Sequence, residues 1–393
     1  MTVEFMEAFG QYRTAADMGP RWTLSEAGAV TGTNLSIVQE GPTTFPGQPQ
    51  TPRSPRPSCL KFLGKDDDAI NATICKLDIT AATETIIAFN FRPDTGEVLT
   101  GKGDTSSIFL TARDASGNVH NSLEIIHGEN IADEEGCYLV VQFSISTTRF
   151  DSRTDVADGK LRWGEWYYIE FRQVIDNTAG ELELRVNGEQ WFYVTGIDTL
   201  AAGVATVSDF EFRAGHPTGS NSYGSGLAYS VTDIIVIDRA STPNDTFPYP
   251  AVIDMLYPDA EVVGEIDFTP QTGSDNAAMV DEVRHDYDTT YNEANVATNK
   301  DRFTVGGSVP QSGFGEVLAV GVQAIAKDTA ASGTRQARVV IYEGATEAQG
   351  ATQTLSENDF MPIYDIFEQN PDTTAQWDMA EVEAAEIGYE IVT

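Results

Sequence analysis

Basic residues are scarce in this sequence. Its 393 residues include 24 Lys and Arg against 60 Asp and Glu, which gives a formal net charge of −36. So large an excess of negative charge repels phosphate backbones and anionic headgroups alike. We therefore expect no nucleic acid and no membrane insertion among the partners of this protein.

Long apolar runs are also missing. No stretch reaches the roughly 18 apolar residues that a membrane-spanning helix needs, and the N-terminal sequence MTVEFMEAFGQYRT lacks a basic segment followed by an apolar one. We therefore expect that the chain has no transmembrane helix and no secretory signal peptide. We expect the chain to fold in a cytoplasm.

Cysteine is rare as well. The three cysteines are Cys59, Cys75 and Cys137, an odd number without metal-ligand spacing. Two of them stand in the apolar segments SCLKF and TICKL. We expect buried, reduced thiols.

Proline clusters divide the chain, which is too long for one ordinary core. GPTTFPGQPQTPRSPRP at 41–57 has too many prolines for a helix or central strand, and STPNDTFPYP at 241–250 interrupts the later pattern. The expected organisation is an N-terminal segment with a proline-rich arm (1–57), a first domain (58–240), a linker (241–258) and a second domain (259–393).

Strand-like segments dominate the first domain. Short β-branched and aromatic stretches are separated by Gly, Asn and Asp, which is typical of an all-β sandwich or barrel. Between 181 and 186, apolar residues alternate with charged ones, and Asn187-Gly188 then supplies a type I′ turn. We expect a hairpin there.

The second domain has fewer strand-like segments. They lie at 260–270, 301–307, 316–328 and 334–344 and predict a second small β-sandwich. A short helix near Met379 and an apolar edge strand, IGYEIV, are expected at its end.

Two segments carry a resemblance to a known fold. LRWGEWYYIEF at 161–171, followed by GELELRVNG at 180–188, resembles the central strands of laminin-G and pentraxin-like, concanavalin A-type domains. The resemblance implies a jelly-roll sandwich over 58–240. This scaffold hosts lectins, glycanases and structural modules, so the fold leaves the function open.

The C-terminal third resembles structural proteins of tailed bacteriophages. The resemblance rests on FTPQTGSDN at 268–276 and NPDTTAQW at 370–377. It implies a virion component of a tail, collar or fibre, assembled in the host cytoplasm, with other virion proteins and further copies of itself as partners. Attachment to host-surface carbohydrate is a further expectation. The alternatives are a capsid decoration protein and a lectin-like module.

Catalytic patterns are incomplete. Glycan hydrolysis needs two carboxylates around the scissile bond, and glucanases of this fold class use E-x-D-x-E or E-x-D-x-x-E on a strand. Glu265 and Asp267 supply the first two acids, but Thr269 and Pro270 follow. The four histidines are scattered. We expect no catalytic residues and no enzyme.

Two groups of side chains are candidate binding sites. Laminin-G-like domains often bind calcium through loop carboxylates, which the resemblance transfers to Asp151, Asp155 and Asp158; a solvated acidic loop is the alternative. Trp163, Trp191 and Tyr193 are candidates for stacking on sugar rings, against the alternative of core aromatics. No other cofactor is expected.

Overall fold

The computed structural model of the chain describes residues 2–9, 11–12, 15–26, 35–41, 44–45, 48–52, 58–62, 73–95, 104–128, 136–143, 149–214, 228–239, 244, 246–306, 316–330, 334–357 and 359–393. The chain divides into two compact units. The first comprises residues 1–9 and 14–253, and the second comprises residues 10–13 and 254–393. The fold is all-β, as the sequence predicts.

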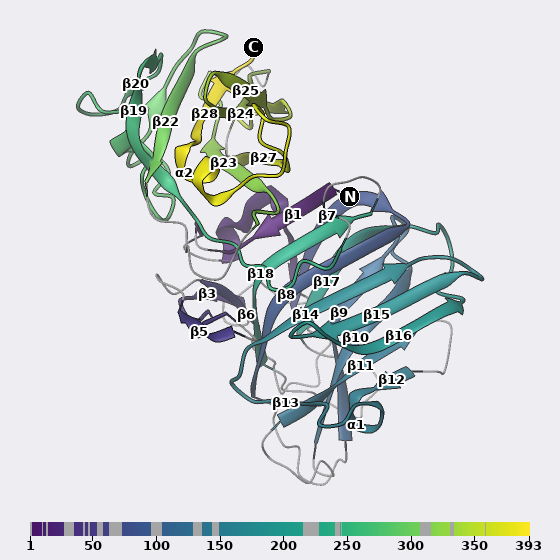
Figure 1. Cartoon of the computed structure of the whole chain (residues 1–393). Helices are drawn as coiled ribbons and strands as arrows, with labels where there is room; N and C mark the ends of the chain where they lie inside the picture. The colour runs from purple at the N-terminus through teal and green to yellow at the C-terminus, as the bar shows by residue number, and fades with distance from the viewer. Residues whose placement is uncertain are drawn as a thin grey trace. The chain divides into compact units, whose positions relative to one another are not determined.

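Two antiparallel sheets form the first unit, and Figure 1 shows their strands side by side. The first sheet has the order β16 (Glu189–Ile197), β15 (Gly180–Val186), β14 (Tyr167–Val174), β8 (Glu84–Thr95), β18 (Ala228–Asp238), β6 (Cys59–Phe62) and β3 (Leu35–Val38), with β1 (Thr2–Glu7) paired to β18. The second has the order β12 (Arg149–Asp151), β11 (Gly136–Phe143), β10 (Val119–Gly128), β9 (Asp104–Arg113), β17 (Val207–Ala214), β7 (Thr73–Ala82) and β2 (Thr23–Glu26), with β13 (Lys160–Arg162) paired to β11. A helical turn, α1 (Ser152–Asp155), follows β12, a 3-10 helix, η1 (Ala15–Arg21), precedes β2, and β4 (Thr44–Phe45) pairs with β5 (Gln48–Pro52).

Aromatic side chains hold the two sheets together. Phe89 of the first sheet lies 5.3 Å from Phe212 of the second, and Phe91 lies 4.7 Å from Phe109, measured between ring centroids. All four are fully buried. Because successive side chains of a strand point to opposite faces, the alternate residues of the same strands form the outer face of each sheet. The first unit is therefore a jelly-roll sandwich with two outer faces.

Most described residues before 58 belong to this sandwich, whereas residues 11–12 belong to the second unit. In β1, Val3 and Met6 pair with Ile237 and Ile235 of β18, at the opposite end of the unit's sequence. Phe5 is buried and lies 5.2 Å from Trp22, again between ring centroids. The N-terminal segment thus contributes strands and core residues to the first unit.

The Asn187-Gly188 turn is confirmed. Asn187 has φ 52° and Gly188 has φ 80°, and the turn joins β15 to β16 as the sequence predicts. The three cysteines are also buried and free, as predicted.

The second unit is a smaller β-sandwich. Its main sheet has the order β19 (Tyr257–Ile266), β22 (Lys300–Gly306), β28 (Glu386–Ile391), β24 (Gln336–Glu343) and β25 (Thr346–Gln349), with β26 (Gln353–Thr354) paired to β24. Two further pairs are β23 (Val320–Ala326) with β27 (Met361–Phe367) and β20 (Thr269–Pro270) with β21 (Asn292–Glu293). The helical segments are η2 (Ala277–Met279) and α2 (Met379–Ala384).

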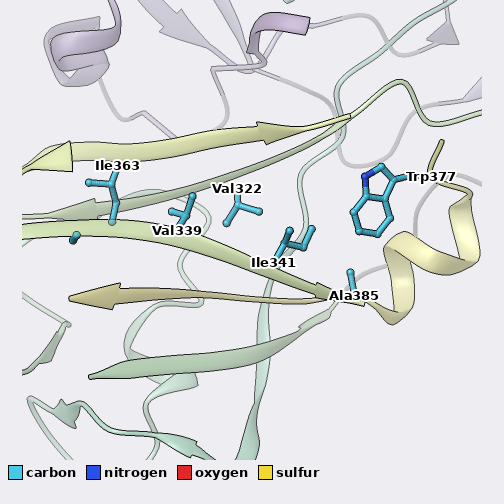
Figure 2. Close-up of a cluster of buried hydrophobic side chains, with 7 residues drawn as sticks. Val322, Val339, Ile341, Ile363, Trp377 and Ala385 are labelled. Carbon is cyan, nitrogen blue, oxygen red and sulfur yellow. The ribbon is translucent and has the colours of Figure 1, made fainter. Parts of the chain in front are cut away.

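The core of the second unit lies between the β23–β27 pair and the main sheet. Its buried members are Val322, Ala337, Val339, Ile341, Ile363, Trp377 and Ala385. Figure 2 shows the indole of Trp377 beside helix α2, and its Nε1 donates a 2.9 Å hydrogen bond to the Phe367 carbonyl. The short helix near Met379 is confirmed as α2, and Asp378 caps it. The expected edge position of the last strand is wrong: β28 lies between β22 and β24, where both of its edges are paired.

No helix of the described residues is long and apolar enough to cross a membrane.

Candidate functional site

Charged side chains form a row on the outer face of the first sheet. In β14, Ile169 and Phe171 are buried in the core, so Arg172 points to the outer face. Strand pairing places Arg172 opposite Glu183 of β15, and Glu183 opposite Tyr193 of β16. Directly paired residues share one face of a sheet, so these three side chains lie in a line across three strands.

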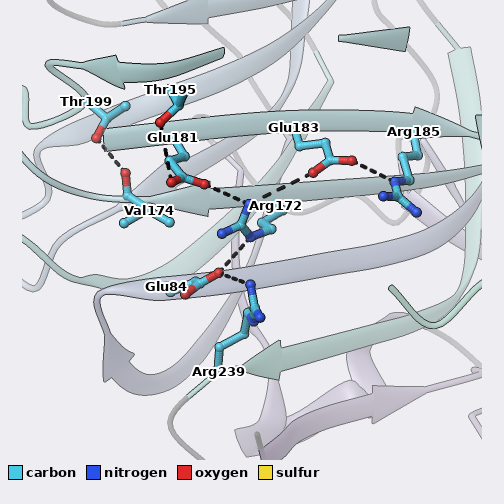
Figure 3. A network of polar contacts seen from close by, with 9 residues as sticks. All are labelled: Glu84, Arg172, Val174, Glu181, Glu183, Arg185, Thr195, Thr199 and Arg239. Carbon is cyan, nitrogen blue, oxygen red and sulfur yellow. Dashed lines mark hydrogen bonds and ion pairs between the residues drawn. The ribbon is translucent and has the colours of Figure 1, made fainter. Parts of the chain in front are cut away.

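Arg172 is the centre of an ion-pair network, shown in Figure 3. Its Nε donates to Glu84 Oε1 at 2.6 Å and its Nη1 donates to Glu181 Oε2 at 2.9 Å. The same Nη1 lies 3.9 Å from Glu183 Oε2. We call Glu84, Arg172, Glu181, Glu183, Arg185 and Arg239 the Arg172 network.

Two further arginines complete this network. Arg239 Nη1 donates to Glu84 Oε1 at 2.6 Å, and Arg185 Nε donates to Glu183 Oε1 at 2.8 Å. The network therefore joins three carboxylates to three guanidinium groups. Such half-exposed ion pairs contribute little stability, about 0–1 kcal/mol each, but they fix the orientation of the side chains.

The charges in the Arg172 network support one another. Burial works against the charged form of Arg172, but the hydrogen bonds and negative charges of Glu84 and Glu181 outweigh it and raise the pKa of Arg172. Its side chain keeps 14% exposure, against 26% for Glu181 and 31% for Arg239. Arg172 thus stays ionised, and the network is open to solvent at its surface.

Tyr193 stands at the end of the row on the outermost strand. It is 46% exposed, which makes it one of the few large apolar side chains that reach the surface in the described part of the chain. Thr195 Oγ1, on the same strand, donates to Glu181 Oε1 at 3.4 Å. An exposed phenol ring therefore adjoins a set of fixed hydrogen-bonding groups. We call Tyr193 and Thr195 with the Arg172 network the outer-face patch.

Residues 246–253 lie on the same outer face beside the patch. The backbone nitrogen of Tyr249 donates to Glu170 Oε1 at 2.9 Å, and that of Ile253 donates to Asp233 Oδ1 at 3.1 Å. The ring of Phe247 lies 3.8 Å from the Arg185 guanidinium. This segment was expected as part of a linker, and it is fixed to β14, β15 and β18.

The outer face of the second sheet carries a second charged cluster. Glu211 pairs with Arg113 at 3.1 Å and also with Arg213, and Lys76 lies 3.4 Å from Asp209. Burial raises the pKa of Asp209 to about 6, although Lys76 opposes this shift. Both carboxylates are nearly inaccessible, with Asp209 3% and Glu211 4% exposed. The outer-face patch is the more accessible of the two surfaces.

The structure separates the three aromatic residues proposed for sugar stacking. Trp191 and Tyr193 are both on β16 of the first sheet, whereas Trp163 follows β13, a strand of the second sheet. Trp163 and Trp191 are half-buried and Tyr193 is exposed. Tyr193 is the one of the three with an exposed ring beside fixed polar groups.

The three aspartates proposed for calcium lie around helix α1. Asp151 caps the helix by accepting from the Arg153 nitrogen at 3.0 Å, and Asp155 Oδ2 accepts from the Asp151 nitrogen at 2.9 Å. Asp158 follows with φ 59° and is exposed. Two of the carboxylates thus serve local turn structure. Within the described ranges, no group of three or more His, Cys, Asp or Glu side chains is placed to hold a metal ion.

Glu265 and Asp267 lie in the second unit. Glu265 is 3.9 Å from the Arg302 guanidinium, and Asp267 Oδ2 accepts from the Lys300 nitrogen at 3.1 Å. Both carboxylates contact the neighbouring strand β22.

Sequence reasoning missed most of the outer-face patch. The alternation at 181–186 correctly puts Glu181, Glu183 and Arg185 on one face. Nothing in the sequence indicates that Glu84 and Arg239 meet them, because these residues come from distant strands. The signal that was available, alternating charges before an Asn-Gly turn, locates one strand and not its neighbours.

Comparison with known proteins shows the fold alone. The sequence matches no protein-family model, and no curated protein matches it. Similar solved structures include the alginate lyase Aly36B (11% identity, TM-score 0.39, covering 60% of this chain and 97% of the lyase) and the cellulose-induced protein Cip1 (14%, 0.37, 60% and 97%). A pentraxin from Limulus polyphemus is also similar (12%, 0.28, 53% and 77%).

The expectation that this protein is not an enzyme is overturned by these comparisons. Alginate lyases recur among the similar structures, including those from Aplysia kurodai and a Chlorella virus. The low identities assign no reaction to this chain.

Proposed function

We propose that the protein binds carbohydrate through the outer-face patch. The observation that carries the proposal is the exposed ring of Tyr193, which lies directly opposite Glu183 and in line with Arg172. A phenol ring offers an apolar face to the C–H groups of a sugar ring. Carboxylates accept hydrogen bonds from sugar hydroxyls and guanidinium groups donate to hydroxyl oxygens, and bonds of this charged kind are about twice as strong as neutral ones.

The ion pairs of the patch favour recognition because they hold these groups in place before a ligand arrives. Arg172 contacts Glu84 and Glu181 through different nitrogens, so neither carboxylate has to be ordered on binding. Immobilising a long side chain at an interface costs about 0.5–1.5 kcal/mol, and the network avoids that cost.

A glycan array with the intact chain tests the proposal. We expect binding to at least one glycan class, and we expect Tyr193→Ala to weaken it by tenfold or more. Val204→Ala is the matched control, because Val204 is 54% exposed and lies outside the patch. Failure to bind any glycan, or equal binding by Tyr193→Ala, would overturn the proposal. Chromatography of the bound glycan after incubation also reveals whether it is cleaved.

We further propose that the protein works in a bacteriophage virion, in a tail, collar or fibre, and as a homo-oligomer. The support is the sequence resemblance at 268–276 and 370–377. Antibody labelling of intact particles under the electron microscope tests it. Label on the tail supports the proposal, label on the head supports a capsid decoration protein, and unlabelled particles overturn both.

A further inference from the structure

The segment 246–253, called the strap below, is held on the outer face of the first sheet by two buried carboxylates. Glu170 accepts from the Tyr249 nitrogen and Asp233 accepts from the Ile253 nitrogen. Both carboxylates have 0% exposure, and Asn90 Nδ2 donates a further 2.6 Å bond to Asp233 Oδ2. The strap therefore covers polar groups that would otherwise face solvent.

The strap contacts the outer-face patch at Arg185. Phe247 packs over the guanidinium of Arg185, and Arg185 Nε donates to Glu183 within the patch. The ring of Tyr249 lies 5.6 Å from that of Tyr168, next to Glu170 on β14. The face beneath the strap is thus continuous with the patch.

Of the two carboxylates that hold the strap, Glu170 is the one with an unsatisfied oxygen. Its Oε1 has one hydrogen bond, whereas its buried Oε2 has no hydrogen-bond partner in the described part of the chain. An ionised carboxylate in such surroundings is costly because one bond replaces several from water. Burial accordingly raises the pKa of Glu170 to about 7, against the opposing effects of the Tyr249 nitrogen and Arg185.

The charged and titratable groups around Glu170 come from β14, β15, β16, β18 and the strap, whereas β8 places Ala88 opposite it. β15 supplies Arg185, which favours ionisation, and Glu183, which opposes it. Tyr168 on the same strand and Tyr249 on the strap both feel the charge of Glu170. On β18 the nearby charge is Asp233, which acts on Tyr168, and on β16 it is Glu189, which acts on Tyr249. Arg185, the cation facing Glu170, is also bonded to Glu183, so it compensates Glu170 only in part.

We propose that the strap is a proton-controlled cover of the sugar-binding face: it stays attached while Glu170 is protonated and loosens when Glu170 ionises. The consequence of this inference is a longer sugar-binding face at higher pH, and that consequence rests on the proposed function. Loosening exposes Tyr168 and Asp233 beside the outer-face patch and frees the guanidinium of Arg185 within it from Phe247. A longer oligosaccharide could then contact both surfaces.

Hydrogen exchange of the intact chain tests the strap itself, without any glycan. After correction for intrinsic rates, we expect the protection of peptides covering 246–253 to fall by about tenfold or more between pH 5 and pH 8. Peptides from β24 in the second unit serve as the internal control. Constant protection of the strap across this range would overturn the proposal, and this wild-type series does not depend on any variant folding.

Glu170→Gln is the matched variant, because its carbonyl oxygen can still accept from the Tyr249 nitrogen but cannot ionise. We expect its strap to stay protected from pH 5 to pH 8. A fall as large as that of the wild type would contradict the role of Glu170.

Glycan binding at the two pH values then tests the consequence. We expect the wild type to bind long oligosaccharides at least about threefold more tightly at pH 8 than at pH 5, with no change for Glu170→Gln. If no glycan binds but the strap loosens, the proposed function fails and the strap stands. If glycans bind equally at both pH values, the covering role fails and the proposed function stands.

Discussion

Glu170 and Tyr249, 79 positions apart in the chain, are joined by a 2.9 Å hydrogen bond from a backbone nitrogen to a buried carboxyl. The bond fixes a proline-rich segment onto the outer face of a sheet. The Glu170 carboxyl is also buried there, and its burial makes the stability of the first unit depend on pH.

The contribution of Glu170 to the unfolding free energy of the first unit should decrease as pH rises. The pKa of Glu170 is raised from 4.5 to about 7 in the folded chain. The stabilisation is therefore fully present below pH 4.5 and is lost as pH rises through about 7, in total up to about 3 kcal/mol. Urea unfolding followed by tryptophan fluorescence measures it, because four of the five tryptophans, Trp22, Trp163, Trp166 and Trp191, belong to this unit. Asp209 contributes in the same direction, and His120, whose pKa burial lowers, contributes in the opposite one. The difference between the wild type and Glu170→Gln therefore isolates Glu170.

Substitution of Gly188 should disturb the contact between the hairpin and the strap. A Cβ at Gly188 would lie 2.5 Å from Tyr249 Cδ1, and the residue has φ 80°. Gly196 has φ 70° but open space around its Cβ position. Both alanine variants incur the cost of positive φ, about 1 kcal/mol, whereas Gly188→Ala also displaces a ring. Equal losses of unfolding free energy in the two variants would show that the Tyr249 contact is unimportant.

The core of the second unit should be sensitive to loss of volume. Ile341 is fully buried in this core, and Val263 on β19 of the same unit is 98% exposed. Ile341→Ala should lower the unfolding free energy by about 2–5 kcal/mol, because it leaves a cavity. Val263→Ala should change it by less than about 0.5 kcal/mol. Calorimetry of the intact chain measures both, and similar effects of the two changes would contradict the assigned core.

The cysteines should not react in the folded protein. Cys59, Cys75 and Cys137 are all buried, and burial raises the pKa of each thiol, that of Cys59 to about 11. Because the thiolate is the reactive form, a disulfide reagent at neutral pH should modify all three only after denaturation. Rapid modification of any one of them in the native chain would show that its surroundings open.

Local pattern predicted much of the fold. Leu182, Leu184 and Val186 alternate with charged residues and are buried, as expected of a half-exposed strand. Asn187 and Gly188 take positive φ because few other residue pairs do so at low cost. Asp378 and Glu381 form the capping box that begins α2. Each of these features depends on residues close together in the chain.

The candidate site was only partly predictable. Tyr193 was among the candidates for sugar stacking, but its neighbours Glu84 and Arg172 were not, because strand order decides which side chains meet. Trp163 was grouped with Tyr193 on residue type, although the two belong to different sheets.

By itself, the sequence determined the class of structure, because its alternation, turn residues and scarcity of helical patterns allow only a β protein. Tertiary structure alone decided that β1 pairs with β18, that β28 is a central strand, and that residues 246–253 cover Glu170. The reason is physical. Turns and alternation depend on the conformational preferences of neighbouring residues, whereas strand order and buried charge depend on packing between segments that are far apart in the chain.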